Sequence, residues 1–96
     1  MKVFISGPIS GTDDYKERFK AAEKMIKAAG DIAINPVKLT KQLPEGTPWE
    51  TYMKMTLTAL EASDAIYMLT DWDNSKGACI EHAWAVKTDK TIFYEH

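Results

Sequence analysis

The stretch AIYMLTDWDNSKGACIEH, residues 65–82, decides the fold. Its first five residues, Ala65–Leu69, form a short apolar run, which is typical of a strand buried on both faces of a parallel sheet. A polar loop follows, and a helix is predicted from Lys76. In open α/β sheets, ligands bind beyond the carboxyl ends of the strands. Glu81 lies about one turn inside this helix and leans back toward that crevice, which makes it a candidate nucleophile.

The rest of the chain repeats the same alternation. Its apolar runs and helical periodicities predict strands at Lys2–Ser6, Asp31–Ile34 and Thr91–Tyr94, and helices at Tyr15–Ala29, 48–62 and Lys76–Lys87. Residues 37–47 are expected to form a surface loop with at most one helical turn. Right-handed crossovers then give an α/β fold, a small flavodoxin-like or Rossmann-like three-layer sandwich with a four-stranded parallel sheet in the order 2-1-3-4. The loops after Ser6 and Leu69 should meet at the switch point.

Length, composition and charge limit the classes of function. With 96 residues, 45% of them hydrophobic and 27% charged, residues 1–96 are expected to be one globular domain. Twelve basic and 14 acidic residues give a net charge of −2 without a basic block, which argues against nucleic-acid binding. No segment is long enough to span a membrane, and a strand that starts at Lys2 leaves no room for a signal peptide. We therefore expect a cytoplasmic protein without a membrane partner.

The helix predicted over residues 48–62 has an unusually broad apolar side. Met55, Ala59 and Ala62 widen its apolar arc to roughly 220°, whereas a helix with one core-facing side has about 100°. Two sides of this helix should therefore be covered. The sheet accounts for one, and a second subunit is the simplest candidate for the other, so we expect a homodimer or a higher homo-oligomer.

Two loops at the predicted crevice contain candidate binding residues. The first is Gly7-Pro8-Ile9-Ser10-Gly11, which could bind an anion through backbone N–H groups, although a tight turn explains it equally well. In the second, Ser75 is suited either to cap the helix or to bind a phosphate group. Gly77 weakens the first helical turn unless a ligand or another backbone must come close, which favours a functional role.

Several titratable side chains are expected to converge with Glu81. They are Asp64 at the head of the third strand, Asp71 and Asp73 in the loop, and Tyr15 at the start of the first helix. Each has a structural alternative, since Asp64 can cap a helix and Tyr15 lies on an apolar stripe. Trp72 would expose costly apolar surface in a loop unless it packs on something, and a planar base would suit it.

The sequence shows no pattern typical of a metal site or of a catalytic Ser-His-Asp triad. His82 and His96 have no metal-ligand spacing with a cysteine or another histidine, and no Ser-His-Asp arrangement is evident. We expect neither a metal nor another cofactor, so the chemistry would rest on carboxylates.

These residues together show a family resemblance. With the first loop, the SDAI segment at 63–66 and a W-x-x-S-x-G-A-x-x-E pattern from Trp72 to Glu81, the chain resembles the nucleoside 2-deoxyribosyltransferase superfamily, and most of all its small phage and prophage members. The resemblance implies that Glu81 attacks the anomeric carbon, as in a retaining glycosidase, and that water or another base resolves the glycosyl ester. It also implies that Asp64 orients or protonates the leaving base and that Tyr15 positions the nucleophile.

The residue six positions before Glu81 bears on the substrate. In this superfamily, transferases that act on free nucleosides tend to have an aspartate there, whereas nucleoside 5′-monophosphate N-glycosidases have a serine, as this chain does at Ser75. The resemblance therefore favours a (deoxy)nucleoside 5′-monophosphate, bound by Ser10, Gly11 and Ser75 and cleaved by hydrolysis or transfer. The glycosidases often have an arginine in the first loop, which is absent here. The alternatives are a non-catalytic module that binds a nucleotide-derived ligand, as a sensor or sponge, and a purely structural phage protein.

Overall fold

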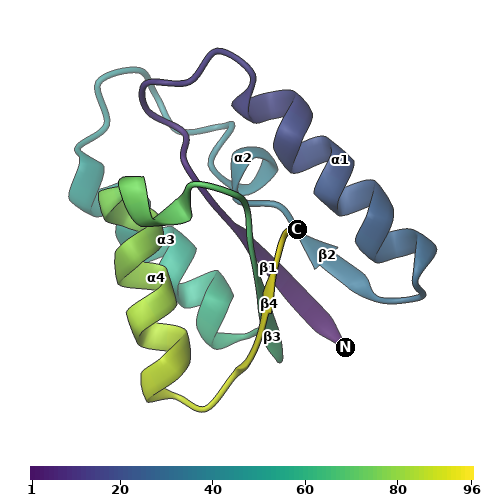
Figure 1. Cartoon of the computed structure of the whole chain (residues 1–96). Coiled ribbons are helices and arrows are strands. Elements are labelled where there is room, and N and C mark those ends of the chain that lie inside the picture. The colour runs from purple at the N-terminus through teal and green to yellow at the C-terminus, as the bar shows by residue number, and fades with distance from the viewer.

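The computed structural model describes residues 1–96 and contains a four-stranded sheet with helices on both sides (Figure 1). In chain order its elements are β1 (Lys2–Ser6), α1 (Tyr15–Ala28), β2 (Ile32–Ile34), α2 (Pro36–Leu39), α3 (Trp49–Glu61), β3 (Ala65–Met68), the 3-10 turn η1 (Trp72–Asn74), α4 (Lys76–Lys87) and β4 (Thr91–Tyr94). All strand pairs are parallel, and the strand order is β2-β1-β3-β4. The predicted fold class and strand order are confirmed.

The element boundaries agree with the sequence pattern to within a residue or two. β1, α4 and β4 have the predicted ends, whereas β2 starts one residue late and β3 ends one residue early. The helical turn expected in residues 37–47 is α2. It forms because Asn35 caps it, accepting a hydrogen bond from the Val37 amide at 3.0 Å, and Pro36 is its first residue. No helix is both long and apolar enough to cross a membrane.

The alternation of side chains along each strand divides the core into two layers. Val3 and Ile5 of β1 point toward α1, where they pack with Phe19 and Ile26. Phe4 points the other way and belongs to the layer beneath α3 and α4. Figure 1 shows α1 on one side of the sheet and α3 with α4 on the other.

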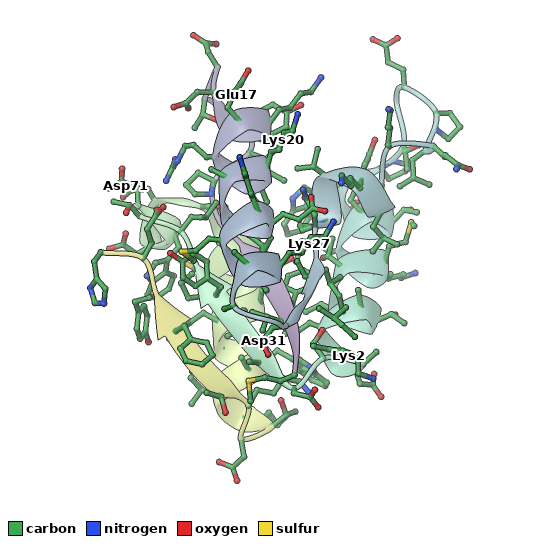
Figure 2. The ribbon with its side chains drawn as sticks, turned by 90° about the vertical axis from the view of Figure 1, so that its right-hand side faces the viewer. Lys2, Glu17, Lys20, Lys27, Asp31 and Asp71 are labelled. Atoms are coloured by element: carbon green, nitrogen blue, oxygen red, sulfur yellow. The ribbon has the colours of Figure 1, made fainter.

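One charged residue of α1 is buried. Glu17 and Lys20 lie on the solvent side of this helix (Figure 2), but Glu23 is only 6% exposed. Its carboxylate accepts hydrogen bonds from Lys38 at 2.8 Å and Asn35 at 3.2 Å and pairs with Lys27 at 3.0 Å. The Lys38 hydrogen bond is the largest cause that lowers the pKa of Glu23 to about 2. Glu23 thus fastens α1 to α2.

The carboxyl ends of β1 and β3 meet as predicted. The Leu69 amide donates to the Ser6 carbonyl oxygen at 2.8 Å. Gly7 lies directly against Leu69, so that a Cβ atom at Gly7 would come within 2.7 Å of the Leu69 Cβ. The loops that follow β1 and β3 therefore start side by side at the switch point of the sheet.

Candidate active site

At this switch point, a buried hydrogen bond joins two segments that are 75 residues apart in the sequence. Ser6, the last residue of β1, donates a 2.5 Å hydrogen bond from its hydroxyl to Oε1 of Glu81 on α4. Ser6 is 1% and Glu81 7% exposed. Ser6 points toward α4 because it lies two residues after Phe4 on the same side of the strand. Ala78 and Ala85, one turn before and after Glu81, are both buried and small, which lets α4 approach the sheet closely.

The environment of Glu81 makes it an unusual carboxylate. Burial raises its pKa from an ordinary 4.5 to about 6, while the hydroxyls of Ser6 and Thr56 act in the opposite direction. Thr56 is a buried residue of α3 near this carboxylate, and its hydroxyl donates to the Met53 carbonyl oxygen at 3.2 Å. With a pKa of about 6, Glu81 is largely ionised at neutral pH, and carboxylates with such raised pKa values concentrate at functional sites.

Ser6 and Thr56 are site residues that the sequence reading missed. The signal was present, because each is polar at a position that faces the core. Ser6 lies on the same side of β1 as the buried Phe4, and Thr56 lies one turn before the buried Leu60 in α3. A buried hydroxyl needs a hydrogen-bond partner, and the carboxylate of Glu81 is close to both.

Ser75 and Gly77, the two predicted ligand residues at the start of α4, each have a structural role as well. Ser75 is the N-cap, and its side chain accepts a hydrogen bond from the Ala78 amide at 3.2 Å. Gly77 faces α3, and a Cβ atom there would lie 3.3 Å from the Met53 sulfur. The hydroxyl proton of Ser75 remains available to a ligand, because the cap uses only the oxygen as an acceptor.

The first loop is buried at one end and open at the other. Gly7 and Pro8 are buried, whereas Ile9, Ser10 and Gly11 are exposed. Gly11 has a φ of +81°, which favours glycine, and a Cβ atom there would meet no atom within 4 Å. Only the buried start of this loop, at Gly7, lies directly against Leu69 at the end of β3.

Trp72 packs on the protein itself. Its ring stacks on His82 with centroids 4.1 Å apart and an interplanar angle of 22°, and His82 Nε2 lies 2.8 Å from the Tyr94 hydroxyl. This stacking accounts for a tryptophan in the loop without a ligand. Asp71, with φ +67°, and Asp73 flank it and are exposed.

The predicted convergence of Asp64 with Glu81 is wrong. The Asp64 carboxylate accepts a hydrogen bond from the Lys2 amide at 2.8 Å, at the amino end of β1, whereas Glu81 binds Ser6 at the carboxyl end. Four residues of a strand separate these ends by about 13 Å. Figure 2 shows Lys2 and Asp71 toward opposite ends of the molecule. The reason is simple: a residue that precedes a parallel strand lies at the edge opposite to the ligand crevice.

Tyr15 lies at the correct edge but in the other layer. It is the first residue of α1, and its ring packs against the core layer beneath that helix. Glu81 belongs to the layer of α3 and α4. The sheet thus lies between the two residues, and the structure does not bring them into contact.

Two basic residues at the carboxyl edge were not predicted. Lys76, the first residue of α4, places its Nζ 4.7 Å from the ring centroid of Trp49, the first residue of α3. Arg18 donates to the Thr70 carbonyl oxygen at 2.7 Å, at the loop after β3. A lysine at a helix N-terminus is electrostatically unfavourable in isolation, so Lys76 would gain from an anion there. Sequence spacing gave no sign that Trp49 and Lys76 meet.

Comparison with known proteins agrees with this architecture. The sequence profile of DUF4406, a domain of unknown function, matches residues 1–94. The chain belongs to the DUF4406 family. No curated protein matches this DUF4406 chain. Its fold is similar to that of a 2-deoxyribosyltransferase from the psychrotolerant bacterium Bacillus psychrosaccharolyticus, with a TM-score of 0.79 at 15% identity over 98% of this chain and 71% of that one.

A second solved structure shows the same likeness. A 2-deoxyribosyltransferase from Leishmania mexicana matches with a TM-score of 0.73 at 18% identity, over 97% of the DUF4406 chain and 62% of the other. The resemblance inferred from the sequence motifs is thus confirmed at the level of the fold. The DUF4406 chain is shorter than both of these proteins and spans less than two thirds of the second.

Proposed function

We propose that this protein cleaves the N-glycosidic bond of a (deoxy)nucleoside 5′-monophosphate with Glu81 as the nucleophile. The observation that carries the proposal is the Glu81 carboxylate, which is buried at the carboxyl ends of β1 and β3 and has a pKa raised to about 6. A buried carboxylate costs stability unless it is well paired, and such groups concentrate at functional sites. The fold shared with two 2-deoxyribosyltransferases supports the same chemistry.

The proposed reaction is a double displacement at the anomeric carbon of the sugar. Ionised Glu81 attacks the anomeric carbon, so a bond forms between a carboxylate oxygen and that carbon while the bond to the base nitrogen breaks. The base leaves with the bonding electrons and takes up a proton from solvent, and the water or base that attacks in the second step returns a proton to solvent. Water or a second base then attacks the same carbon and releases the carboxylate. The Ser6 hydroxyl holds Oε1 and thereby fixes the orientation of the other oxygen. Asp64 has no part in this proposal.

The first turn of α4, with the basic side chain of Lys76, supports a phosphorylated substrate. The first turn of α4 presents N–H groups, the Ser75 hydroxyl proton and the Lys76 ammonium group, while Ser10 is exposed in the neighbouring loop. An anion near Lys76 would neutralise a cation that the helix dipole disfavours. A free nucleoside would leave this charge uncompensated, which is why a monophosphate is the better candidate.

A non-catalytic binding module is the second candidate. It is favoured by the placement of Asp64 and Tyr15 away from Glu81, since neither that carboxylate nor that phenol is then in place to assist the leaving base. The same loops could then bind a nucleotide-derived ligand without turnover.

Free base release distinguishes the two candidates. The purified protein and Glu81→Gln are incubated with a panel of nucleosides and 5′-monophosphates that includes modified pyrimidines, and the free base is measured by chromatography. Release from monophosphates by the wild type, lost in the mutant, supports the proposal. A thermal shift with monophosphates in both proteins, but no base release by either, supports the binding module.

A further inference from the structure

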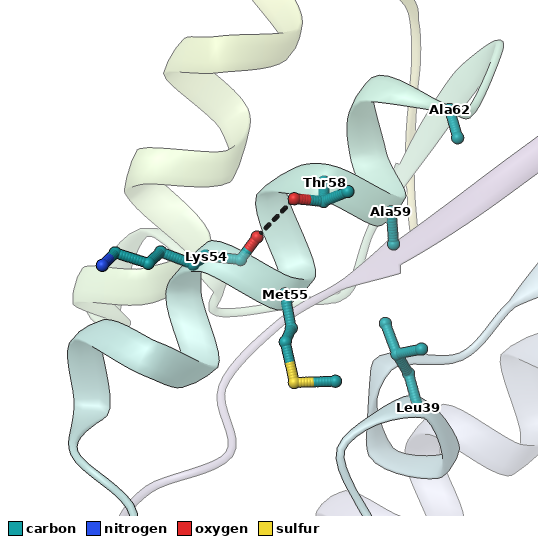
Figure 3. A pocket seen from close by; sticks show the side chains of 6 residues that line it. All are labelled: Leu39, Lys54, Met55, Thr58, Ala59 and Ala62. Carbon is teal, nitrogen blue, oxygen red and sulfur yellow. Dashed lines mark hydrogen bonds between the residues drawn. The ribbon is translucent and has the colours of Figure 1, made fainter.

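Two hollows flank the outer side of α3. One, of about 440 Å³, lies between α2 and α3, where Met55, Ala59 and Ala62 face Leu39 (Figure 3). The other, of about 450 Å³, lies between α3 and α4 and is bounded by Leu57, Glu61 and Trp84. Lys54 and Thr58 border both hollows, so they form a ridge between them. The outer side of α3 is therefore one ridge with a groove on each flank.

The two grooves of this surface are mostly apolar. Two charged side chains lie beside them, Lys54 on the ridge and Glu61 at the edge of one groove. Leu39 is 41% exposed, and Met55 and Ala59 are half-buried. Thr58 adds no unsatisfied polar atom, because its hydroxyl donates to the Lys54 carbonyl oxygen at 2.7 Å. The side chains of Lys54 and Glu61 are exposed and form no ion pair within the chain.

We propose that a second copy of this chain covers the surface by laying its own α3 antiparallel along it, about a two-fold axis near Thr58. Lys54 and Glu61 are seven residues apart and lie on nearly the same line of the helix, about two turns from one another. Their midpoint falls next to Thr58. An antiparallel partner helix centred there brings Lys54 opposite Glu61 of the partner subunit, and the symmetry creates the same pair a second time.

The shape of α3 suits this arrangement. In an isologous contact, the ridge of each copy must fit a groove of the other, and here every copy has both. Thr58, Ala59 and Ala62 are small and allow the two helices to approach closely. Met55 is unbranched and flexible, which suits a side chain that fills the groove of its partner.

The inner side of the same helix reaches the candidate active site. Thr56 faces Glu81, and Met53 packs against Gly77 at the start of α4. A partner subunit would hold α3, and with it the wall of the site, in place. The interface itself does not depend on the proposed function, because none of its residues belongs to the catalytic or binding set.

Charge exchange tests the proposed pairing. The mass in solution is measured by light scattering after size exclusion at several concentrations, and the expected value is a dimer of 21.6 kDa, twice the 10.8 kDa of the chain. Lys54→Glu and Glu61→Lys should each shift the protein to the monomer, because like charges then face one another twice. The double variant Lys54→Glu/Glu61→Lys should restore the dimer.

Matched controls carry the same charge changes on the opposite side of the molecule. Lys20→Glu and Glu17→Lys, on the outer side of α1, should leave the mass unchanged (Figure 2). Thermal melts of every variant show that it is folded. The proposal is overturned by a wild-type monomer at every concentration, by single variants that remain dimeric, or by a double variant that stays monomeric.

Discussion

The Ser6 hydroxyl donates its 2.5 Å hydrogen bond to the Glu81 carboxylate from the far end of the chain, 75 residues away. This contact lowers the pKa of Glu81 against the larger effect of burial. It therefore limits how far burial raises the pH at which the carboxylate becomes ionised, and with it the pH at which a glutamate nucleophile would begin to work.

Replacing Ser6 by Ala should raise the pKa of Glu81 above its present value of about 6. The hydroxyl stabilises the charged form, so its loss favours the protonated form. The shift is measured by ¹³C NMR titration of the glutamate carboxylates, with Glu81→Gln to assign the signal. Ser10→Ala, which removes an exposed hydroxyl, is the control and should cause no shift. If base release is observed, the acidic limb of its pH–rate profile should move to higher pH by the same amount.

Glu81→Gln should stabilise the protein at pH 7.5 by about 2 kcal/mol, which is the free-energy equivalent of a pKa of about 6 in the folded state against 4.5 in the unfolded state. The sign follows from the raised pKa. The cost of the buried charge is fully present above pH 6, decreases as the pH falls from 6 to 4.5, and vanishes below 4.5. Urea unfolding at pH 7.5 and pH 4 measures both limits. Equal stability of the two proteins at pH 7.5 would contradict the burial argument.

Gly7→Ala should destabilise the protein, whereas Gly77→Ala should leave its stability nearly unchanged. Gly7→Ala places a Cβ atom 2.7 Å from the Cβ of the fully buried Leu69 and should cost about 1–3 kcal/mol. Gly77→Ala meets only the flexible Met53 sulfur at 3.3 Å, and the better helix propensity of alanine, about 1 kcal/mol, offsets this contact. Thermal unfolding compares the two. If Gly77→Ala keeps its stability but loses monophosphate binding, Gly77 serves a ligand as well as packing.

Glu23→Gln should destabilise the protein by about 1–2 kcal/mol at pH 7, a modest amount because Lys27 and Lys38 are themselves 61% and 64% exposed. The pKa of Glu23 is lowered to about 2, so its ionised form stabilises the fold above pH 4.5 and this contribution is lost as the pH falls toward 2. Wild type and variant should therefore converge in stability near pH 2. Chemical denaturation at several pH values provides the measurement. Glu17→Gln, on the exposed side of α1, should change nothing.

Lys76→Gln should weaken the binding of a nucleoside 5′-monophosphate by about tenfold and leave the binding of the matching nucleoside unchanged, because only the former pairs with the ammonium group. Calorimetry in a Glu81→Gln background avoids turnover of the ligand. Lys87→Gln, at the other end of α4, is the matched control. Equal losses for both ligands would show that Lys76 acts by holding Trp49 rather than by binding phosphate.

The fold could be predicted because its signals are local. The apolar runs at Lys2–Ser6 and Ala65–Leu69 are short and bounded by Gly7 and by a polar loop, so the strands and their parallel pairing follow from the alternation with helices. Glu81 could be predicted for the same reason, since its position depends only on one strand, one loop and one helix.

The surroundings of Glu81 depend on contacts between distant segments and could not be predicted in the same way. Nothing local tells that Thr56 faces Glu81, that Trp49 meets Lys76, or that the partner of Trp72 is His82, ten residues further on. The error on Asp64 is different. Asp64 was expected beside Glu81 although it precedes β3, and a residue that precedes a parallel strand lies at the edge of the sheet opposite to the residues that follow the strand.

The Ser6–Glu81 contact also has a consequence for protein synthesis. A ribosome makes the chain from its amino end, so Ser6 emerges early and waits for its partner while 75 further residues are added, roughly 4 to 15 seconds at usual rates of elongation. During this time the apolar β1 has no β3 beside it, because the two strands pair Phe4 with Ile66. The carboxylate thus enters an environment that is completed only at the end of translation, and any fragment that stops before α4 lacks the candidate chemistry altogether.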